Sequence, residues 1–304
     1  MQFFEDTIAA QSLIEEMIRK YGYASEHNFW YYQYYQDYYN PPHRNIFATT
    51  DYGALLGTYD EHAKEYFVVF DPLALSKDRI RLVNEYIEWI FSNTPVKKVW
   101  FQLDQSNRKE FLRTAAYPPH LCRIYYTLTC PIMNLEKFDT ELPGGHYKTL
   151  RKEMHKFYRE HQVVLCDART YEDKKGLHDI VDDWKKKRPN NERGMTGVYH
   201  KMIDGSFEGM DEARVFVVDG KASGFNAGWK IPNIDRFYAA VGIHNYSVDD
   251  LGTMLYLEDL LWLKNKGYRE ADMGGGEKSL TAFKNKFLPE SSYKLHLFSV
   301  KRPE

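Results

Sequence analysis

Residues 272–287 read Asp-Met-Gly-Gly-Gly-Glu-Lys-Ser-Leu-Thr-Ala-Phe-Lys-Asn-Lys-Phe. This pattern predicts the end of a strand, then a turn made by Gly274, Gly275 and Gly276, and then a basic helix over Glu277–Phe287. Glycines let the backbone approach a ligand closely, and the amides at the start of a helix suit an anion or a carbonyl oxygen. The alternative is a turn that needs positive φ, followed by an amphipathic surface helix.

The segments around this stretch alternate between the periods of strands and helices. In the second half of the chain we expect a hairpin across Asp219-Gly220, since this pair is a strong two-residue turn signal. We expect strands at Val163–Cys166, Arg214–Val218, Ala222–Lys230, Arg236–Ile243, Glu270–Met273 and Tyr293–Val300, and helices at His146–Glu160, Tyr171–Lys187 and Leu251–Lys266.

The first half has the same order of elements as the second half, namely strands, a helix, a strand, a helix and a strand. We expect strands at Ala54–Tyr59, Glu65–Phe70, Lys97–Leu103 and Arg123–Thr129, and helices over residues 7–20, Lys77–Ser92 and Asn107–Ala115. The fold class is therefore mixed α/β, with two similar halves inferred from element order alone. The Pro- and Gly-containing segment Pro131–Gly145 predicts the boundary, which gives domains at 1–140 and 141–304.

The densest aromatic tract of the chain is residues 29–39, Phe-Trp-Tyr-Tyr-Gln-Tyr-Tyr-Gln-Asp-Tyr-Tyr. Aromatic side chains fill nearly every position instead of one face. One interpretation is a core helix wedged between other elements, which is the usual role of aromatic stripes. The other is a wall of a binding cleft, and the two are compatible.

Composition limits the classes of function. A chain of 304 residues is long enough for two domains of about 150 residues, and a net charge of −2 gives no general attraction to nucleic acid or to anionic membranes. Three cysteines without metal-ligand spacing argue against disulfides and a zinc site, and we expect no metal. The sequence shows neither a signal peptide nor a transmembrane segment, so we expect a cytoplasmic protein. The oligomeric state is not readable.

Three stretches resemble a known group of proteins. They are residues 272–287, the basic segment Gly144–Phe157 (Gly-Gly-His-Tyr-Lys-Thr-Leu-Arg-Lys-Glu-Met-His-Lys-Phe), and Tyr246–Gly267, where a long helix closes on a glycine. Together they resemble the phosphatidylglycerol lysyltransferase C-terminal domain and Fem-type aminoacyltransferases. The resemblance implies two acetyltransferase-like (GNAT-like) halves in tandem, with helices on both faces of the sheets and the active site in the C-terminal half.

The resemblance also implies a reaction. Relatives transfer an activated acyl group, often an amino acid from aminoacyl-tRNA, to an amine or a hydroxyl. Lys284 matches the residue that stabilises the donor ester or the developing oxyanion. The acceptor stays open between a small molecule, a peptide and a lipid headgroup, and no tightly bound cofactor is expected.

Other residues are candidates for binding and proton transfer. We expect one of four residues to assist proton removal, since each lies on or near the strands that should frame the cleft: Asp235, Tyr238, His244 or Glu277. We expect the donor to contact the three glycines together with Asp272 and Lys278. Donor phosphates are expected at three basic residues of the linking helix, Lys148, Arg151 and Lys152, for which the alternative is a solvated charged face.

The identity of the donor is indicated by residues 244–253, which read His-Asn-Tyr-Ser-Val-Asp-Asp-Leu-Gly-Thr. Acetyltransferases bind the coenzyme A pyrophosphate at this place with glycines and an arginine, whereas here Asp249 and Asp250 would repel it. This favours aminoacyl-tRNA as co-substrate and partner. The alternatives are an acyl-coenzyme A-dependent N-acyltransferase and a non-catalytic binding protein with the same fold.

Overall fold

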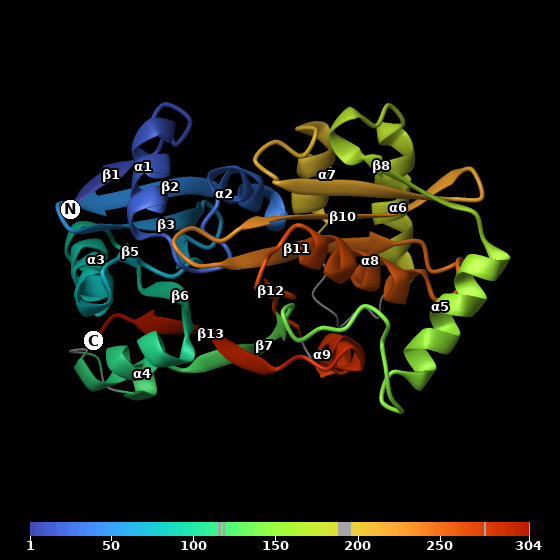
Figure 1. Ribbon diagram of the computed structural model, residues 1–304. Coiled ribbons are helices and arrows are strands. Elements are labelled where there is room, and N and C mark those ends of the chain that lie inside the picture. Colours follow the sequence, from blue (N-terminus) through green and yellow to red (C-terminus); the bar gives the residue numbers. More distant parts are fainter. Residues whose placement is uncertain (115–116, 118, 188–195, 277, 304) are drawn as a thin grey trace.

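The computed structural model describes residues 1–114, 117, 119–187, 196–276 and 278–303, which fold around one long mixed sheet (Figure 1). The strands in chain order are β1 (Gln2–Phe4), β2 (Arg44–Thr50), β3 (Gly53–Asp60), β4 (Glu65–Val68), β5 (Leu73–Ala74), β6 (Lys98–Asp104), β7 (Ile124–Asn134), β8 (Val163–Asp167), β9 (Glu212–Val218), β10 (Lys221–Lys230), β11 (Arg236–His244), β12 (Glu270–Asp272) and β13 (Ser291–Lys301). Their spatial order is β1-β2-β3-β4-β6-β13-β7-β12-β11-β10-β9-β8, with β5 beside β3.

The helices lie on both faces of this sheet, as predicted. They are α1 (Gln11–Tyr21), α2 (Phe29–Tyr35), α3 (Arg79–Asn93), α4 (Gln105–Thr114), α5 (Lys148–Glu160), α6 (Lys174–Lys187), α7 (Gly197–Asp204), α8 (Leu251–Asn265) and α9 (Lys278–Lys284). In the first half, Phe47 and Leu56 pack against α1 and α2, whereas their neighbours Ala48 and Leu55 pack against α3. The alternation follows from the two-residue period of a strand, and it gives each face its own core.

The second half is built in the same way. Val215 and Phe225 of its strands belong to a core with α6 and α7. Phe216 and Phe237 belong to a core on the other face with α5 and α8. Each half of the sheet therefore carries helices on both of its faces.

The two halves exchange their last strands at the centre of the sheet. Strand β13, at the end of the chain, lies between β6 and β7, with Leu295 opposite Asp104 of β6 and Leu128 of β7. Strand β7, from the first half, lies between β13 and β12, where Ile132 pairs with Asp272. Each half thus supplies a strand to the hydrogen-bonded ladder of the other.

Most predicted elements are present within a few residues of their expected ends, and some expectations were wrong. The strand expected to stop at Thr129 continues to Asn134, because β12 and β13 supply hydrogen-bonding partners on both sides of it. Its Pro131 lacks an amide hydrogen, yet the Pro131 carbonyl still accepts from the Met273 amide. Strands β1, β2 and β5 and helix α7 were not predicted from the sequence. The domain boundary near residue 140 stays a prediction.

The strand exchange predicts that neither half folds alone. A fragment of residues 141–304 lacks β6 and β7, so β13 has no neighbour and β12 loses one of its two. We expect this fragment to show no cooperative thermal transition by circular dichroism, and we expect co-expression with residues 1–140 to restore one. A transition of the isolated fragment at the melting temperature of the full chain would contradict this expectation.

Candidate active site

A cleft of about 700 Å³ opens where the two halves meet, and both of them line it. The first half contributes residues of α2, β6 and β7, including Gln102 and Leu128. The second half contributes the end of β11, the start of α8, the glycine turn and α9, including His244 and Lys284. The cleft therefore depends on the strand exchange, since β7 and β13 bring these elements together.

The aromatic tract serves both of the roles predicted for it. Phe29 and Tyr32 are buried in the core beneath α2, whereas Tyr31, Tyr35 and Tyr38 line the cleft. Burial raises the pKa of the Tyr31 and Tyr35 phenols well above their usual value, so these groups stay neutral. Further aromatic side chains complete the lining, namely Tyr126, Trp184, Tyr199, Tyr238, Tyr246, Tyr256 and Phe283.

The glycine turn, residues 274–276, lines the cleft as part of the second half of the chain. Gly274 has φ of +78°, a conformation that favours glycine. A side chain at Gly275 would meet Leu128 at 3.0 Å, so this position needs glycine for close approach to β7. The amides of Gly274 and Gly276 donate to Asp272 Oδ1 (2.8 Å) and to the Thr129 carbonyl (3.0 Å). Two of the three amides that we expected to face a ligand are therefore used within the protein.

Lys284 is the cation that reaches the turn. Its side chain is only 2% exposed, and its Nζ donates to the carbonyl oxygens of Met273 (2.5 Å) and Gly274 (2.9 Å). Burial lowers the pKa of this ammonium to about 8, although the charge of Asp272 and the Cys130 thiol act in the opposite direction. An ammonium has three protons, so two hydrogen bonds to the turn leave one proton for a group in the cleft.

Asp272 lies behind the turn and does not line the cleft. It is completely buried. Its Oδ2 accepts hydrogen bonds from Ser25 Oγ (2.5 Å) and from the Tyr293 hydroxyl (2.7 Å). Together with the bond from the Gly274 amide, these contacts tie the loop before α2, strand β13 and the glycine turn to one carboxylate. The structure thus gives Asp272 a positioning contact with the turn instead of direct access to a donor.

Sequence reasoning missed Glu26, which lines the cleft. Burial raises the pKa of this carboxyl to about 8, and repulsion from Asp71 and Asp272 adds to the shift. The loop that carries Glu26 is held by the His27 ring, whose Nδ1 accepts from the amides of Tyr23 (3.0 Å) and Ala24 (3.2 Å). No local pattern marks Glu26, because its neighbours in space come from distant parts of the chain.

The other predicted site residues divide into two groups. Tyr238 and His244 line the cleft, and the edge of the Tyr238 ring lies close to Gly274. Asp235 and Lys278 are exposed and outside the cleft lining, and Glu277 lies outside the described residues.

The linking helix α5 does not reach the cleft either. Lys148 and Lys152 are exposed on it, and Arg151 donates to the carbonyl oxygens of Leu142 and Gly144. The guanidinium thus holds the segment before its own helix, and the expected group of phosphate contacts is not assembled at the cleft.

The start of α8 is acidic, as the sequence indicated. Asp249 and Asp250 both line the cleft. Asp250 adopts a left-handed conformation with φ of 61° immediately before the helix, and its side chain makes no capping hydrogen bond. Two carboxylates therefore stand where the positive end of a helix dipole would otherwise favour an anion.

Comparison with solved structures identifies the fold. The structure of L-PGS from Bacillus licheniformis superimposes with a TM-score of 0.69 at 14% identity, covering 98% of this chain and 92% of that one. FemX gives 0.62 at 9% identity over 99% and 98% of the two chains. A tandem GNAT protein from the clavulanic acid biosynthesis pathway gives 0.58 at 11% identity over 100% and 99%. This chain has the tandem GNAT-like fold.

The resemblance seen in residues 272–287 is thereby confirmed for the fold. No family model and no curated protein matches the sequence. Within the part of the chain that the structure describes, no helix is both long and apolar enough to span a bilayer. The same residues bring together no group of three His, Cys, Asp or Glu side chains suited to a metal ion.

Replacing Asp272 by alanine tests its positioning contacts. The change removes hydrogen bonds from Ser25, Gly274 and Tyr293, and bonds to a charged group contribute about 1.5–3 kcal/mol each. We expect Asp272→Ala to lower the free energy of unfolding in urea by about 3 kcal/mol or more. Alanine at the exposed Asp51 should change it by less than about 0.5 kcal/mol. Equal effects of the two substitutions would contradict the assignment.

The raised pKa of Glu26 predicts a pH-dependent stability. The pKa in the folded state is about 8 against a usual 4.5, so folding takes up a proton and stability is lost as pH rises from about 4.5 through 8. Glutamine cannot lose a proton. We expect the melting temperature of Glu26→Gln to match wild type near pH 5 and to exceed it by a few degrees near pH 9. The exposed control Glu16→Gln should show a difference that does not change with pH.

Proposed function

We propose that this protein is an aminoacyltransferase, which moves an aminoacyl group from aminoacyl-tRNA to an amine or hydroxyl acceptor. The observation that carries the proposal is the pair of carboxylates, Asp249 and Asp250, in the cleft at the start of α8. A pyrophosphate at this place would be repelled, whereas the ammonium of an aminoacyl group would be attracted. L-PGS and FemX share this fold, and they support the same class of reaction by analogy.

The aromatic lining fits such a donor as well. Tyr31, Tyr35 and Tyr38 line the same cleft as the two carboxylates. A cation over an aromatic face is stabilised by the ring quadrupole, most strongly where water is excluded. A cleft that holds both acidic and aromatic side chains therefore favours a positively charged group over the phosphates of coenzyme A.

The reaction requires attack of the acceptor nitrogen or oxygen on the carbonyl carbon of the donor ester. The new bond forms first and gives a tetrahedral intermediate with an oxyanion. The bond to the ribose oxygen then breaks as the carbonyl re-forms, and the ribose oxygen leaves with a proton that replaces the one lost by the acceptor. Lys284 is positioned to donate a hydrogen bond to the oxyanion that develops between these steps, since its Nζ is held on the turn beside the cleft. Buried charge acts strongly there because the surroundings are poorly polarisable.

A base must accept the proton of the attacking group. Glu26 and His244 both line the cleft and are two candidates for this base. With a pKa near 8, the Glu26 carboxylate becomes available close to neutral pH and is a stronger base than an ordinary glutamate. Glu277 stays a candidate from the sequence alone. The acceptor can be a small molecule, a peptide or a lipid headgroup.

The tRNA body would have to be bound away from the acyl group. The exposed lysines of α5, Lys148 and Lys152, lie on one helix face, spaced by four residues. Such a face can bind a phosphate backbone without base contacts, and binding of that kind weakens steeply with salt. We assign these lysines to the tRNA backbone as part of the proposal.

A donor titration tests the proposal. We expect calorimetry to show binding of a mixed pool of aminoacyl-tRNA and no binding of acetyl-coenzyme A. We expect Lys284→Met to lower the rate of aminoacyl transfer by about 10²–10³-fold, the usual effect of removing an oxyanion donor. The exposed Lys301→Met at the end of β13 serves as the matched control and should retain the wild-type rate.

The other outcomes identify the alternatives. Tight binding of acetyl-coenzyme A with no binding of aminoacyl-tRNA would make the protein an acyl-coenzyme A-dependent N-acyltransferase. Binding of aminoacyl-tRNA without transfer to a panel of amines, peptides and lipid headgroups would make it a non-catalytic binding protein.

A further inference from the structure

The loop between α1 and α2 belongs to the first half of the chain, but residues of the second half hold it. The Gly22 carbonyl at its start accepts a hydrogen bond from Asn233 Nδ2 (2.8 Å), and Asn28 Nδ2 at its end donates to the Gly209 carbonyl (2.8 Å). Glu26 lies between these two anchors and lines the cleft. The place of this candidate base therefore depends on the other half of the chain.

The indole ring of Trp229, in β10, holds the peptide that precedes Glu26. Its Nε1 donates to the Ser25 carbonyl (2.9 Å), and both residues are buried, with Trp229 2% and Ser25 3% exposed. A peptide unit is planar, so a bond that fixes the direction of the Ser25 carbonyl also fixes the amide of Glu26. A buried carbonyl that loses its partner is costly, which favours this bond in the folded state.

The ring of Trp229 also packs behind the cleft. Trp229 does not line the cleft itself, but its ring centroid lies 5.0 Å from the centroids of Tyr31 and Tyr238, which both do. Aromatic rings at this separation attract one another. One indole therefore contacts three parts of the wall: helix α2, strand β11 and the loop that carries Glu26.

Titratable groups face Glu26 from the elements packed around it. They are two carboxyl groups, one thiol and three phenols, namely Asp71, Asp272 of β12, Cys130 of β7, Tyr31 of α2, Tyr238 of β11 and Tyr293 of β13. Burial, with the charge of Asp71 in second place, raises the pKa of Glu26 to about 8. A loop that is free to move would let water reach this carboxyl, and its pKa would return toward the usual 4.5.

We propose that Trp229 is a positioning residue for Glu26, which it holds in the cleft through the Ser25 carbonyl. The role of Glu26 as the base rests on the proposed aminoacyl transfer, whereas its placement by Trp229 does not. The substitution Trp229→Phe keeps an aromatic ring against Tyr31 and Tyr238 and removes the N–H donor. It therefore tests the hydrogen bond more than the packing.

A carbon-13 NMR titration of the Glu26 carboxyl tests the placement without any substrate. The signal is assigned by its loss in Glu26→Gln. We expect the apparent pKa of Glu26 to be lower in Trp229→Phe than in the wild-type chain by about one pH unit or more. The control Trp100→Phe removes the same kind of N–H from a bond to Glu65 Oε2 (2.6 Å), outside the cleft lining, and should leave the pKa unchanged.

Aminoacyl transfer provides the second measurement. A misplaced base slows proton removal and leaves donor binding intact. We therefore expect Trp229→Phe to lower kcat by about tenfold or more and to change KM for aminoacyl-tRNA by less than about twofold. The acidic limb of the pH–rate profile should move to lower pH together with the pKa of Glu26. Trp100→Phe should keep the wild-type kcat and profile.

Melting curves show whether each variant is folded. If Trp229→Phe does not fold, β-(3-benzothienyl)alanine is introduced at this position instead, since it keeps both rings and lacks only the N–H. The proposal is overturned if the folded variant has the wild-type pKa at Glu26, or if Trp229→Phe and Trp100→Phe lower this pKa equally. A lowered pKa in a chain that transfers no aminoacyl group would confirm the role of Trp229 and contradict the proposed function.

Discussion

The exchange of β7 and β13 between the two halves is the constraint on which the rest of the structure depends. Strand β13 completes the ladder of the first half against β6, while β7 completes that of the second against β12. Hydrogen bonds of a buried sheet must be satisfied, so neither half can be separated from the other without leaving edge groups unpaired. The cleft lies beside this crossing, and its two walls keep their places because the sheet between them is continuous.

Burial governs the behaviour of the charged side chains near the place where β7 and β13 lie side by side. The Asp272 carboxylate is buried but accepts three hydrogen bonds from three separate segments. Lys284 is buried with two carbonyl partners, and its pKa is lowered to about 8. Glu26 stands in the same poorly hydrated region and its pKa is raised to about 8. An acid and a base whose pKa values are brought close to neutral pH are the groups that proton transfer needs.

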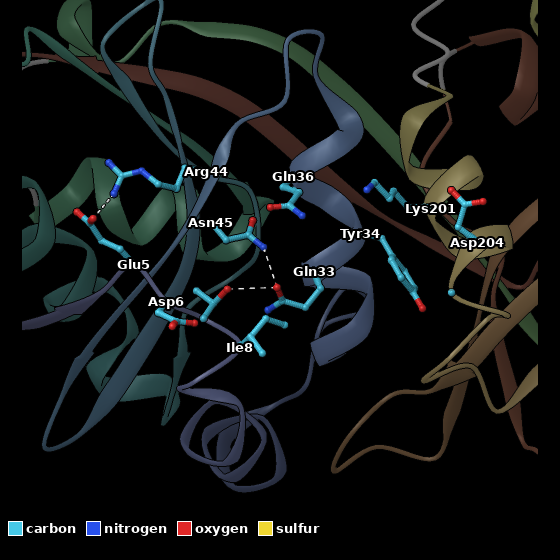
Figure 2. Close-up of a pocket in the computed structure, with 12 residues that line it drawn as sticks. Glu5, Asp6, Ile8, Gln33, Tyr34, Gln36, Arg44, Asn45, Lys201 and Asp204 are labelled. Carbon is cyan, nitrogen blue, oxygen red and sulfur yellow. Dashed lines mark hydrogen bonds and ion pairs between the residues drawn. The ribbon is translucent and has the colours of Figure 1, made fainter.

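Helix α2 borders two hollows of the molecule. Its aromatic residues Tyr31 and Tyr35 line the cleft, and Gln33, its one residue that is not aromatic, lines a second hollow of about 410 Å³ on the other side (Figure 2). The helix is short, and its position is fixed by Asn28, whose side chain accepts from the Tyr31 amide and donates to the Gly209 carbonyl of the second half. The tract that is richest in tyrosine in the chain thus has three neighbours: a core, a cleft and a second hollow.

The sequence by itself determined the mixed α/β class, the order of most elements, the glycine turn followed by the helix that carries Lys284, and the acidic start of α8. These features depend on local period, turn chemistry and residue type, which are written in short stretches of chain. Only the tertiary structure decided that β7 continues past Pro131, that Arg151 binds carbonyl oxygens of its own linker, and that Asp272 supports the turn from behind. It also brought Glu26 to the cleft and Trp229 to Ser25, because contacts between residues far apart in sequence, and the burial that shifts their pKa values, arise only when the sheet is assembled.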